Sequence, residues 1–352
     1  MGVMAETTAH PVTPSQSMAH LDQYRVELTG YCYRMLGAAF EAEDAVQETM
    51  VRAWRGFERF EGRAALRSWL YRIATNVCFD MLNSRQRRAR PMDLGPASSA
   101  DSVLRPGLPE ATWIQPMPDS HILPSGDDPA DVTVARESVR LAFVTALQHL
   151  PPRQRAVLIL REVLRWPASD VGELLGTTVV SVNSALQRAR STLAANDVTE
   201  TDPLEPADEA QRELLARYVD AFERYDLDAL VSLLREDATL SMPPYDLWLR
   251  GHDDITRWFL GQGIDCKGSR LVPTVANGMP AFGQYRPASR GGHEPWALQV
   301  IEISGGRISG LSSFLDTQRL FPLFGLPRRL EPVAVDAARA GSHDVDKPHQ
   351  DE

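Results

Sequence analysis

The segment from Arg63 to Asn83 constrains this chain more than any other. It reads RAALRSWLYRIATNVCFDMLN, and its apolar residues recur at steps of three and four, which predicts one buried face of an α-helix: Leu66, Leu70, Ile73 and Val77. The other faces carry cations, aromatic rings and an amide: Arg67, Trp69, Tyr71, Arg72 and Asn76. Such side chains suit single-stranded nucleic acid, because cations pair with phosphates, a ring stacks on a base and an amide reads a base edge. An ordinary amphipathic helix with a solvated charged face and Trp69 in the core fits the same pattern, so this helix alone leaves both interpretations open.

Length and composition limit the class of protein. With 352 residues the chain is too long for one ordinary core, so we expect two or three domains. A hydrophobic content of 43% and a charged content of 24% are those of a globular protein, and the net charge of −10 argues against a non-specific coat on DNA. No apolar run approaches the ~20 residues of a membrane span, and the N-terminus lacks the features of a signal peptide. We therefore expect a cytoplasmic protein with no membrane partner.

The three cysteines are scattered along the chain: Cys32, Cys78 and Cys266. Their spacing fits neither a metal site nor a disulfide framework, and reduced thiols are usual in the cytosol. We expect no metal, no cofactor and no disulfide.

The neighbours of the Arg63–Asn83 segment are patterned as well. Residues 21–37 and 41–57 each carry a helical apolar stripe, and Trp54 belongs to the second stripe. The opposite face of 41–57 carries two acids and an amide: Asp44, Gln47 and Glu48. An arginine run follows Asn83, and its charge alone suits a helix C-terminus: Arg85, Arg87, Arg88 and Arg90.

Two sequence motifs resemble parts of sigma factors of the extracytoplasmic-function (ECF) type: GRAALRSWLYRIATN resembles region 2.3 and EDAVQETMVRAW resembles region 2.2. The resemblance implies that 63–83 opens the −10 promoter element, with Asn76 beside a flipped base, and that Asp44, Gln47 and Glu48 contact the β′ coiled coil of core RNA polymerase. The arginine run would be region 2.4, along promoter DNA. The residues that the resemblance assigns to −10 DNA are Arg63, Arg67, Trp69, Tyr71, Arg72, Asn76, Arg87 and Arg88.

Residues 91–134 are rich in Pro, Ser, Gly and Asp. The segment contains seven carboxylates and, as its one strong cation, Arg105. Such a composition cannot bury enough apolar surface to fold alone, so the segment is predicted to be a linker. Trp113 and Ile114 are its expected local anchors. It is either an inert tether or, as the resemblance implies, an acidic strand that threads through polymerase near its active site.

Residues 135–195 are helical by pattern. A short helix closed by Gly176 precedes a second helix from Val179 to Leu193, capped by Thr177 or Thr178, which predicts a helix-turn-helix. Amides and arginines on the outer face suit the major groove, and after a region 2 match the unit resembles region 4, the −35 reader. The −35 candidates are Ser181, Asn183, Ser184, Gln187, Arg188 and Arg190. Many ECF sigma factors carry a basic residue where Asn183 stands, which bears on the −35 sequence that is read.

The C-terminal third predicts an α+β domain. The pattern begins with two helices and then changes to the period of two that is typical of strands. A helix near 253–261 and a strand meander with a Gly305-Gly306 turn follow. This order of elements resembles the SnoaL-like, or NTF2-like, cone. Catalytic relatives place acid–base pairs in the cone. The candidates for such a pair here are Tyr245, Trp248, His252, Tyr285 and Asp316. No tight pair is visible among them, which favours a regulatory role over catalysis. The segment SFLDTQRLFPLFGLP follows the last strand and is predicted to dock near the linker or region 2, through Asp316, Leu320, Phe321 and Phe324.

Together these words resemble the long ECF type with a fused SnoaL-like domain, the SigG and SigJ-type actinobacterial group. The expected fold is multidomain: two all-α sigma domains and an α+β cone. The boundaries are 1–20 disordered leader, 21–90 region 2, 91–134 linker, 135–195 region 4, 196–208 linker, 209–326 SnoaL-like domain and 327–352 disordered tail.

The expected function is promoter recognition for core RNA polymerase, bound through its β′ and β subunits, without catalysis by this chain. The cone would regulate activity in cis and could hold an unknown small ligand. One alternative is a helix-turn-helix regulator with a ligand-binding cone, which predicts tight duplex binding without polymerase. Another is a SnoaL-type enzyme fused to a DNA-binding segment, which predicts turnover without the residues up to Leu193.

Overall fold

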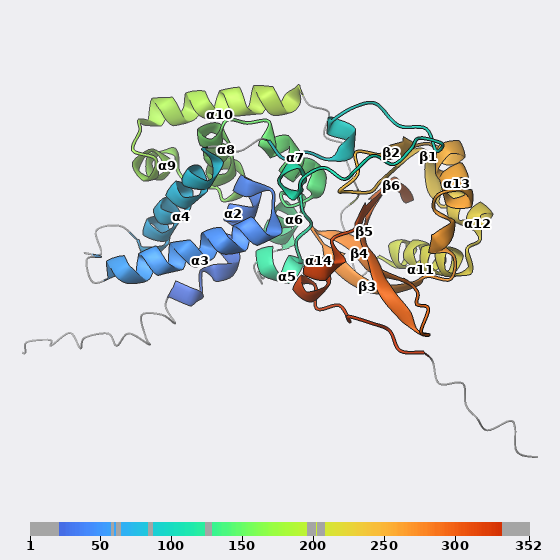
Figure 1. Cartoon of the computed structure of the whole chain (residues 1–352). Coiled ribbons are helices and arrows are strands. Elements are labelled where there is room, and N and C mark those ends of the chain that lie inside the picture. Colours follow the sequence, from blue (N-terminus) through green and yellow to red (C-terminus); the bar gives the residue numbers. More distant parts are fainter. Residues whose placement is uncertain are drawn as a thin grey trace, which may run out of the picture.

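The computed structural model describes residues 21–57, 60, 65–83, 87–123, 129–195, 202 and 208–332. Figure 1 shows a helical lobe and an α/β lobe, with the segment after α4 crossing from one to the other. We call residues 91–123 of this segment the linker. The predicted leader 1–20, most of the 196–208 connection and residues 333–352 lie outside the described residues.

The first half of the helical lobe is a three-helix unit, the N-terminal bundle. Its helices are α2 (Arg25–Leu36), α3 (Ala39–Gly56) and α4 (Leu66–Leu82). The α2–α3 turn is tight because Gly37 adopts the left-handed conformation, with φ at 70°. Tyr31 and Thr75 hydrogen-bond at 2.8 Å between α2 and α4, inside the core.

Two positions in this bundle differ from the sequence pattern. Trp54 was predicted in the buried stripe of α3, but its side chain is 52% exposed, because it follows the same outer face as Gln47. Tyr71 was predicted on a polar face of α4, but it is fully buried against Tyr31 and Trp166. Trp166 comes from a loop much later in the chain, which periodicity within α4 cannot reveal.

The second half of the helical lobe, the C-terminal bundle, contains the predicted helix-turn-helix. Gly176, with φ at 60°, separates its last two helices, and the Thr178 hydroxyl accepts a hydrogen bond from the Ser181 amide as N-cap. Helix α8 begins at Pro152, whose fixed φ suits the first position of a helix. The elements are α6 (Pro129–Glu137), α7 (Leu141–Gln148), α8 (Pro152–Leu158), the π-helical turn η4 (Ile159–Val163), α9 (Ala168–Leu174) and α10 (Val179–Ala194).

The two bundles share one hydrophobic core. Arg155 of α8 is buried beneath α2, where its guanidinium donates to carbonyl oxygens that include those of Met35 and Leu150. Arg34 of α2 reaches Ser138 Oγ at 2.7 Å. Burial lowers the pKa of both guanidinium groups to about 10, which still leaves them charged at neutral pH.

The α/β lobe holds one six-stranded sheet in the order β2-β1-β6-β5-β4-β3. The β1–β6 pair is parallel, and the other pairs are antiparallel. The predicted meander and its Gly305-Gly306 turn are present between β3 and β6. The elements are α11 (Glu209–Arg224), α12 (Leu227–Ser232), β1 (Leu234–Ser241), β2 (Trp248–Arg250), α13 (His252–Leu260), η5 (Ile264–Cys266), β3 (Arg270–Ala276), β4 (Met279–Pro287), β5 (His293–Ser304), β6 (Arg307–Phe314) and α14 (Thr317–Leu323).

The linker and the start of the C-terminal tail are ordered by contact with other elements. The linker forms three short helical turns: η2 (Pro91–Asp93), η3 (Glu110–Thr112) and α5 (Asp119–Ile122). Leu330, predicted in the disordered tail, exchanges backbone hydrogen bonds of 2.8 and 2.9 Å with His293 of β5. That prediction is wrong for the described residues of the tail, because β5 begins before its pairing with β6 starts at Leu298, and this free stretch offers backbone groups that a composition-based prediction ignores.

Candidate nucleic-acid and regulatory surfaces

The outer face of α3 carries the predicted polymerase contacts. Asp44, Gln47 and Glu48 are all exposed, since the buried stripe of α3 lies on the opposite side. Glu48 pairs with Arg52 at 2.7 Å, and Arg52 also reaches Asp80 of α4 at 3.4 Å. These exposed ion pairs add little to stability, so this face is free to serve as a contact surface.

The predicted −10 residues of α4 occupy different environments. Asn76 is exposed, and Trp69 is partly buried with its ring 5.0 Å from that of Phe60. Arg67 pairs with Glu27 of α2 at 3.1 Å. Helix α4 therefore buries Tyr71 in a core while presenting Asn76 to solvent, and its role in −10 DNA stays a prediction.

The C-terminal bundle covers part of α4. The Trp166 ring lies 4.9 Å from that of Tyr71, and the Arg67 guanidinium lies 5.3 Å from the Trp166 centroid. Arg72 approaches Glu173 of α9 at 3.5 Å. In this arrangement Tyr71 cannot stack on a base, because the C-terminal bundle occupies the space beside its ring.

The arginine run after α4 is divided between surface and interior. Arg87 is exposed and contacts His149 Nδ1 at 2.8 Å. Arg88 is buried, pairs with Glu41 of α3 at 2.5 Å and donates to the Trp113 carbonyl at 2.6 Å. The assignment of Arg88 to DNA is therefore wrong for this conformation, because its guanidinium fastens the linker to α3. Arg63 and Arg85 lie outside the described residues.

The recognition-type helix α10 lies along the top of the helical lobe in Figure 1. Its core-facing residues Val182, Leu186 and Ala189 are buried. All six predicted −35 residues are exposed on the other sides: Ser181, Asn183, Ser184, Gln187, Arg188 and Arg190. Arg190 pairs with Glu162 at 2.5 Å, while the first turn also exposes Val180. A polar face of this kind fits a major groove, and its assignment to −35 DNA stays a prediction.

The linker is bonded to the α/β lobe along its length. Ser98 N donates to the Trp248 carbonyl at 2.8 Å, and Trp248 Nε1 donates to the Gly95 carbonyl at 3.0 Å. Leu108 N donates to the Pro244 carbonyl at 2.8 Å. The linker is thus neither a free tether nor a threaded strand in this structure, because the α/β lobe satisfies its backbone groups.

The tip of the β3–β4 hairpin inserts among three other parts of the chain. Asn277, with φ at 58°, is fully buried there. Its Nδ2 donates to the Tyr33 hydroxyl of α2 at 2.7 Å and to the Val139 carbonyl at 2.6 Å, and its Oδ1 accepts from Met117 N at 2.9 Å. One amide side chain therefore joins the α/β lobe to the N-terminal bundle, the linker and the segment before α7.

This cluster continues on both sides of Asn277. The Tyr33 hydroxyl donates in turn to the Gln115 carbonyl at 2.7 Å, and Gly278 N donates to Asp119 Oδ1 at 2.7 Å. Burial raises the pKa of Asp119 to about 6, against a smaller opposing effect of the Gly278 hydrogen bond. Sequence reasoning missed this cluster: the dipeptide Asn277-Gly278 signals a hairpin turn but not what the turn touches.

The predicted regulatory contacts lie in α14 or flank it, and a further residue of α14, Arg319, contacts both the linker and α3. Arg319 pairs with Glu110 of the linker at 2.5 Å, and its guanidinium lies 3.8 Å from the centroid of the Phe40 ring in α3. Phe321 instead packs on Tyr285 of β4, with ring centroids 5.1 Å apart. Arg319 is a contact that the sequence pattern did not single out, and the regulatory role of Asp316, Leu320, Phe321 and Phe324 stays a prediction.

The candidate acid–base residues of the α/β lobe are spread over several places. Tyr285 donates its hydroxyl to the Pro327 carbonyl at 2.8 Å, and burial raises its pKa to about 12. Trp248 is bonded to the linker, His252 opens α13 and Asp316 precedes α14. The interior of the sheet is crossed by a buried chain of hydrogen bonds that joins Tyr218, Gln299, Gln284 and Ser269.

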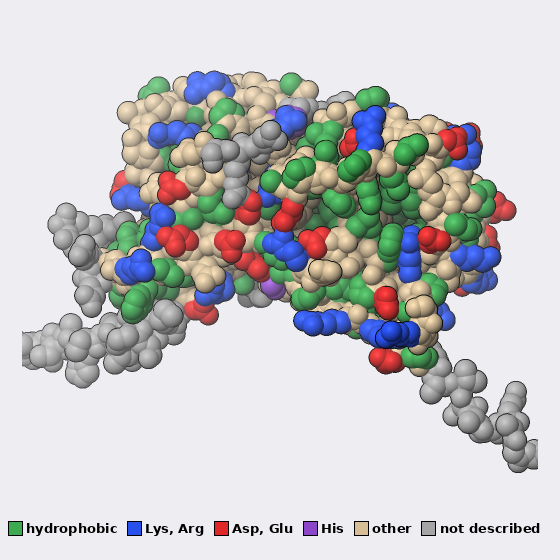
Figure 2. All heavy atoms as spheres, viewed as in Figure 1, with side chains coloured by type: hydrophobic (Ala, Val, Ile, Leu, Met, Phe, Trp, Pro, Cys, Tyr) green, Lys and Arg blue, Asp and Glu red, His purple; other side chains and the backbone are tan. Residues whose placement is uncertain are grey.

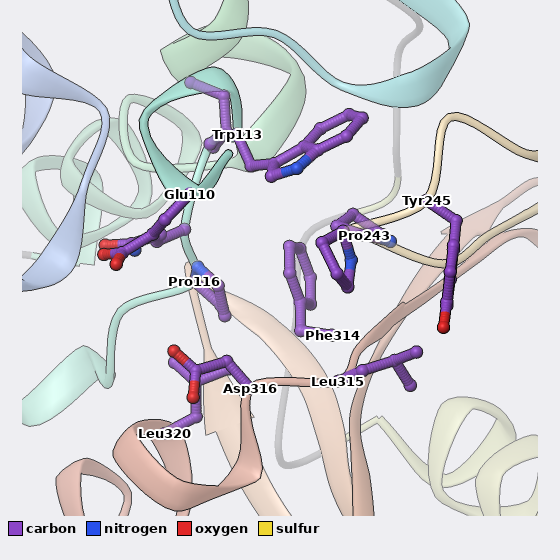
Figure 3. A pocket seen from close by; sticks show the side chains of 12 residues that line it. Glu110, Trp113, Pro116, Pro243, Tyr245, Phe314, Leu315, Asp316 and Leu320 are labelled. Atoms are coloured by element: carbon purple, nitrogen blue, oxygen red, sulfur yellow. The ribbon is translucent and has the colours of Figure 1, made fainter. Parts of the chain in front are cut away.

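A cavity of about 340 Å³ lies where the linker meets the α/β lobe. Figure 3 shows Trp113 and Pro116 of the linker on one side and Pro243, Tyr245 and Phe314 of the lobe on the other. In Figure 2, hydrophobic side chains gather on this face, over the strands beside the linker. Within the described residues no group of three His, Cys, Asp or Glu could hold a metal ion. In the same part of the chain, no helix is both long and apolar enough to cross a bilayer.

Comparisons with known proteins match each part of this architecture. Family models for sigma-70 region 2, sigma-70 region 4 and a SnoaL-like domain match residues 21–88, 140–193 and 215–310. The chain is 46% identical over 315 residues to the ECF RNA polymerase sigma factor SigG of Mycobacterium tuberculosis, which covers 89% of this chain and 84% of that protein. It is 29% identical over 251 residues to the ECF RNA polymerase sigma factor SigJ of the same species, covering 69% of this chain and 72% of that protein. The crystal structure of that species' SigJ has the same fold, with a TM-score of 0.57, 23% identity, and coverage of 88% of this chain and 99% of that chain.

Proposed function

The chain belongs to the ECF RNA polymerase sigma factors with a C-terminal SnoaL-like domain, and from this premise we propose that the SnoaL-like domain regulates the factor in cis by holding it closed. As an ECF sigma factor the chain directs core RNA polymerase to promoters. The N-terminal bundle corresponds to region 2, the C-terminal bundle to region 4 and the α/β lobe to the SnoaL-like domain. We call the arrangement in which all three contact one another the closed state.

The observation that carries this proposal is the burial of Asn277 between the domains. Its side chain bonds at once to Tyr33 of region 2, to Met117 of the linker and to Val139. Each of these hydrogen bonds is worth about 1 kcal/mol net of the bonds that water would make instead, so separation of any one part from the hairpin tip is opposed. The SnoaL-like domain thereby acts on the position of all the promoter-binding parts.

In the closed state, several side chains expected to bind promoter DNA are engaged in contacts within the chain. Region 4 lies against Arg67, Tyr71 and Arg72 of the −10 helix, and Arg88 is fastened to the linker. Strand opening requires aromatic rings and cations that reach unpaired bases and phosphates. In the closed state these side chains are engaged within the chain, so the closed state is the inactive one.

The remaining contacts follow from the exposed faces. The outer face of α3, with Asp44, Gln47 and Glu48, is the polymerase surface for β′, and region 4 reads −35 DNA through α10 beside the β subunit. Asn76 and the opened α4 face take −10 DNA. The dispersed positions of the SnoaL-like candidates, together with the hydrogen bonds that already hold Trp248 and Tyr285, favour binding over catalysis in that domain. The factor acts in the cytoplasm, where the polymerase is.

Reconstituted transcription tests the proposal. Three forms are compared with the same core polymerase and promoter: the full chain, a form that ends near Thr199 and a control that ends at Pro332 and keeps every described residue. We expect the form ending near Thr199 to bind core more tightly and to give more run-off transcript, and the Pro332 form to match the full chain. Equal activity of all three, with equal core affinity, would rule out regulation in cis. Tight duplex binding without polymerase would instead support an ordinary helix-turn-helix regulator.

A further inference from the structure

We propose that the cavity between the linker and the SnoaL-like domain binds a small hydrophobic amine, and that the bound amine holds the linker in its docked position. This inference rests on the proposed function, because it makes the closed state ligand-dependent. It differs from a ligand inside the cone, since the walls of this cavity come from two separate parts of the chain.

The walls of the cavity are apolar and shared between the two parts. The linker supplies Trp113, Ile114 and Pro116, and the SnoaL-like domain supplies Pro243, Tyr245 and Phe314. A volume of about 340 Å³ lies at the small end of the ~300–1,000 Å³ of ordinary ligand pockets. A flat ring system with a short side chain fits such a space, and the aromatic walls suit both a ring and a cation.

The charges around the cavity select the amine. Glu110 and Asp316 lie in its wall, and its lining contains no Lys, Arg or His. Burial alone would raise the pKa of Glu110, but hydrogen bonds from Arg319 and Gln115 outweigh it and lower that pKa, so this carboxylate is charged at neutral pH. Arg319 lies 2.5 Å from Glu110 and 4.0 Å from Asp316. Arg88 also helps to lower the pKa of Glu110, but its own charge is matched by Glu41 at 2.5 Å. Two carboxylates against one guanidinium leave one negative charge, which an ammonium group neutralises and a ligand carboxylate would oppose.

A buried acceptor supports the same ligand class. Gln115 lines the cavity and is only 7% exposed. Its Nε2 donates to Glu110 Oε1 at 2.7 Å, whereas its Oε1 is buried and has no hydrogen-bond partner among the described residues. A buried acceptor without a partner is unusual in a native protein. Because this oxygen is shielded from the cavity in the observed side-chain conformation, a ligand N–H reaches it only after the Gln115 side chain rotates.

The consequence for regulation follows from linkage. A ligand that touches both walls binds the state in which the walls face each other and shifts the population towards it. The closed state has this geometry. The amine therefore acts as a corepressor, which lowers polymerase binding as its concentration rises.

The binding test uses three indoles of nearly one shape and different charge: tryptamine, tryptophol and indole-3-propionic acid. Each is titrated calorimetrically into the full chain. We expect tryptamine to bind at least tenfold more tightly than the acid, with tryptophol between them. Equal affinities would overturn the assignment to an amine, and absence of binding by all three at millimolar concentration would overturn the site.

Three variants test whether tryptamine binds in this cavity. Leu315→Trp fills the cavity and is expected to abolish tryptamine binding, while the matched control Leu260→Trp adds the same ring at a residue of α13 that is 63% exposed and should leave binding intact. Asp316→Asn keeps the size of the side chain, so it should weaken tryptamine and leave tryptophol unchanged. Retention of tryptamine binding by a folded Leu315→Trp chain would place the ligand elsewhere and overturn the proposal.

Transcription separates this inference from the proposed function. Tryptamine should lower run-off by the full chain and leave the Leu315→Trp chain unaffected. Binding without any effect on run-off would overturn the corepressor role, while the comparison with the form ending near Thr199 would still stand, because it uses no ligand. Failure of that comparison together with intact binding would reject the regulatory domain but keep the site.

Discussion

Asn277 Nδ2 donates a hydrogen bond of 2.7 Å to the Tyr33 hydroxyl, and so joins the tip of the β3–β4 hairpin to helix α2 across 244 positions of sequence. The same side chain bonds to the linker and to the start of the C-terminal bundle. One buried amide thus connects the SnoaL-like domain to the parts of the factor that meet polymerase and promoter.

Asn277→Gly should open the factor. The variant loses three side-chain hydrogen bonds but keeps the backbone, because glycine adopts a φ of 58° more easily than asparagine does. At about 1 kcal/mol each, the lost bonds favour opening by about 3 kcal/mol, or roughly 100-fold in the closed-to-open ratio. Run-off transcription should rise, and amide exchange at residues 110–123 should become faster.

Tyr33→Phe is the partner variant for this test. It removes one hydroxyl that bonds to both Asn277 and the Gln115 carbonyl, and it preserves the ring in the core. Its effect should have the same direction and a smaller size. If Asn277→Gly loosened the linker but lowered transcription, the SnoaL-like domain would assist the factor and the proposed sign would be wrong.

Arg319→Gln should weaken the hold of α14 on the rest of the factor. The change removes the ion pair with Glu110 and the contact with the Phe40 ring, while α14 keeps its apolar packing through Phe321. Because these groups are partly exposed, we expect only a two- to fivefold rise in core affinity. Arg328→Gln, in the exposed chain after α14, is the matched control and should change nothing. Equal effects of both variants would contradict a specific role for Arg319.

Asn76→Ala should relax selectivity for the −10 element without loss of polymerase binding. Asn76 is exposed on α4, so its removal leaves the core intact and takes away only an amide that could meet a base edge. Run-off from promoters with altered −10 bases measures the selectivity, and a titration with core polymerase measures polymerase binding. Asn183→Ala on α10 is the counterpart, since it should alter the response to −35 bases alone. A parallel loss of core binding in Asn76→Ala would indicate misfolding instead.

Asp119 should make the stability of the closed state depend on pH. Its pKa is raised by burial from an ordinary 3.8 to about 6, so the folded chain binds a proton more tightly than the unfolded chain. The stabilisation is fully present below the ordinary pKa and is lost as pH rises through about 6. The wild type should therefore lose stability between acidic pH and pH 7 relative to Asp119→Asn, which remains neutral and can still accept from Gly278 N.

Urea unfolding of both chains at about pH 4.5 and pH 7 checks this sign. The variant should have the higher midpoint at pH 7, and the two midpoints should converge at acidic pH. A gap that widened on acidification would show that Asp119 is held as a charged group in the native state.

The sequence by itself determined the local elements and the family. Helical periodicity, the glycine before the recognition-type helix and the alternating strands depend on near neighbours, so they could be predicted from residues such as Gly176 and Thr178. The exposure of Asp44, Gln47, Asn76 and the α10 face followed from the same periodicity. The roles of these residues in polymerase and promoter binding stay predictions.

Only the tertiary structure decided which polar groups are engaged within the chain. Tyr71 and Arg88 have the chemistry of a nucleic-acid surface, yet one is buried against Trp166 and the other is bonded to Glu41 and the linker. Asn277 has the sequence signature of a turn, yet it bonds to residues far away in the chain. Local sequence sets which face of an element is polar. Contacts between distant segments set whether that face meets solvent, DNA or another part of the same chain, because burial is a property of the whole packed molecule.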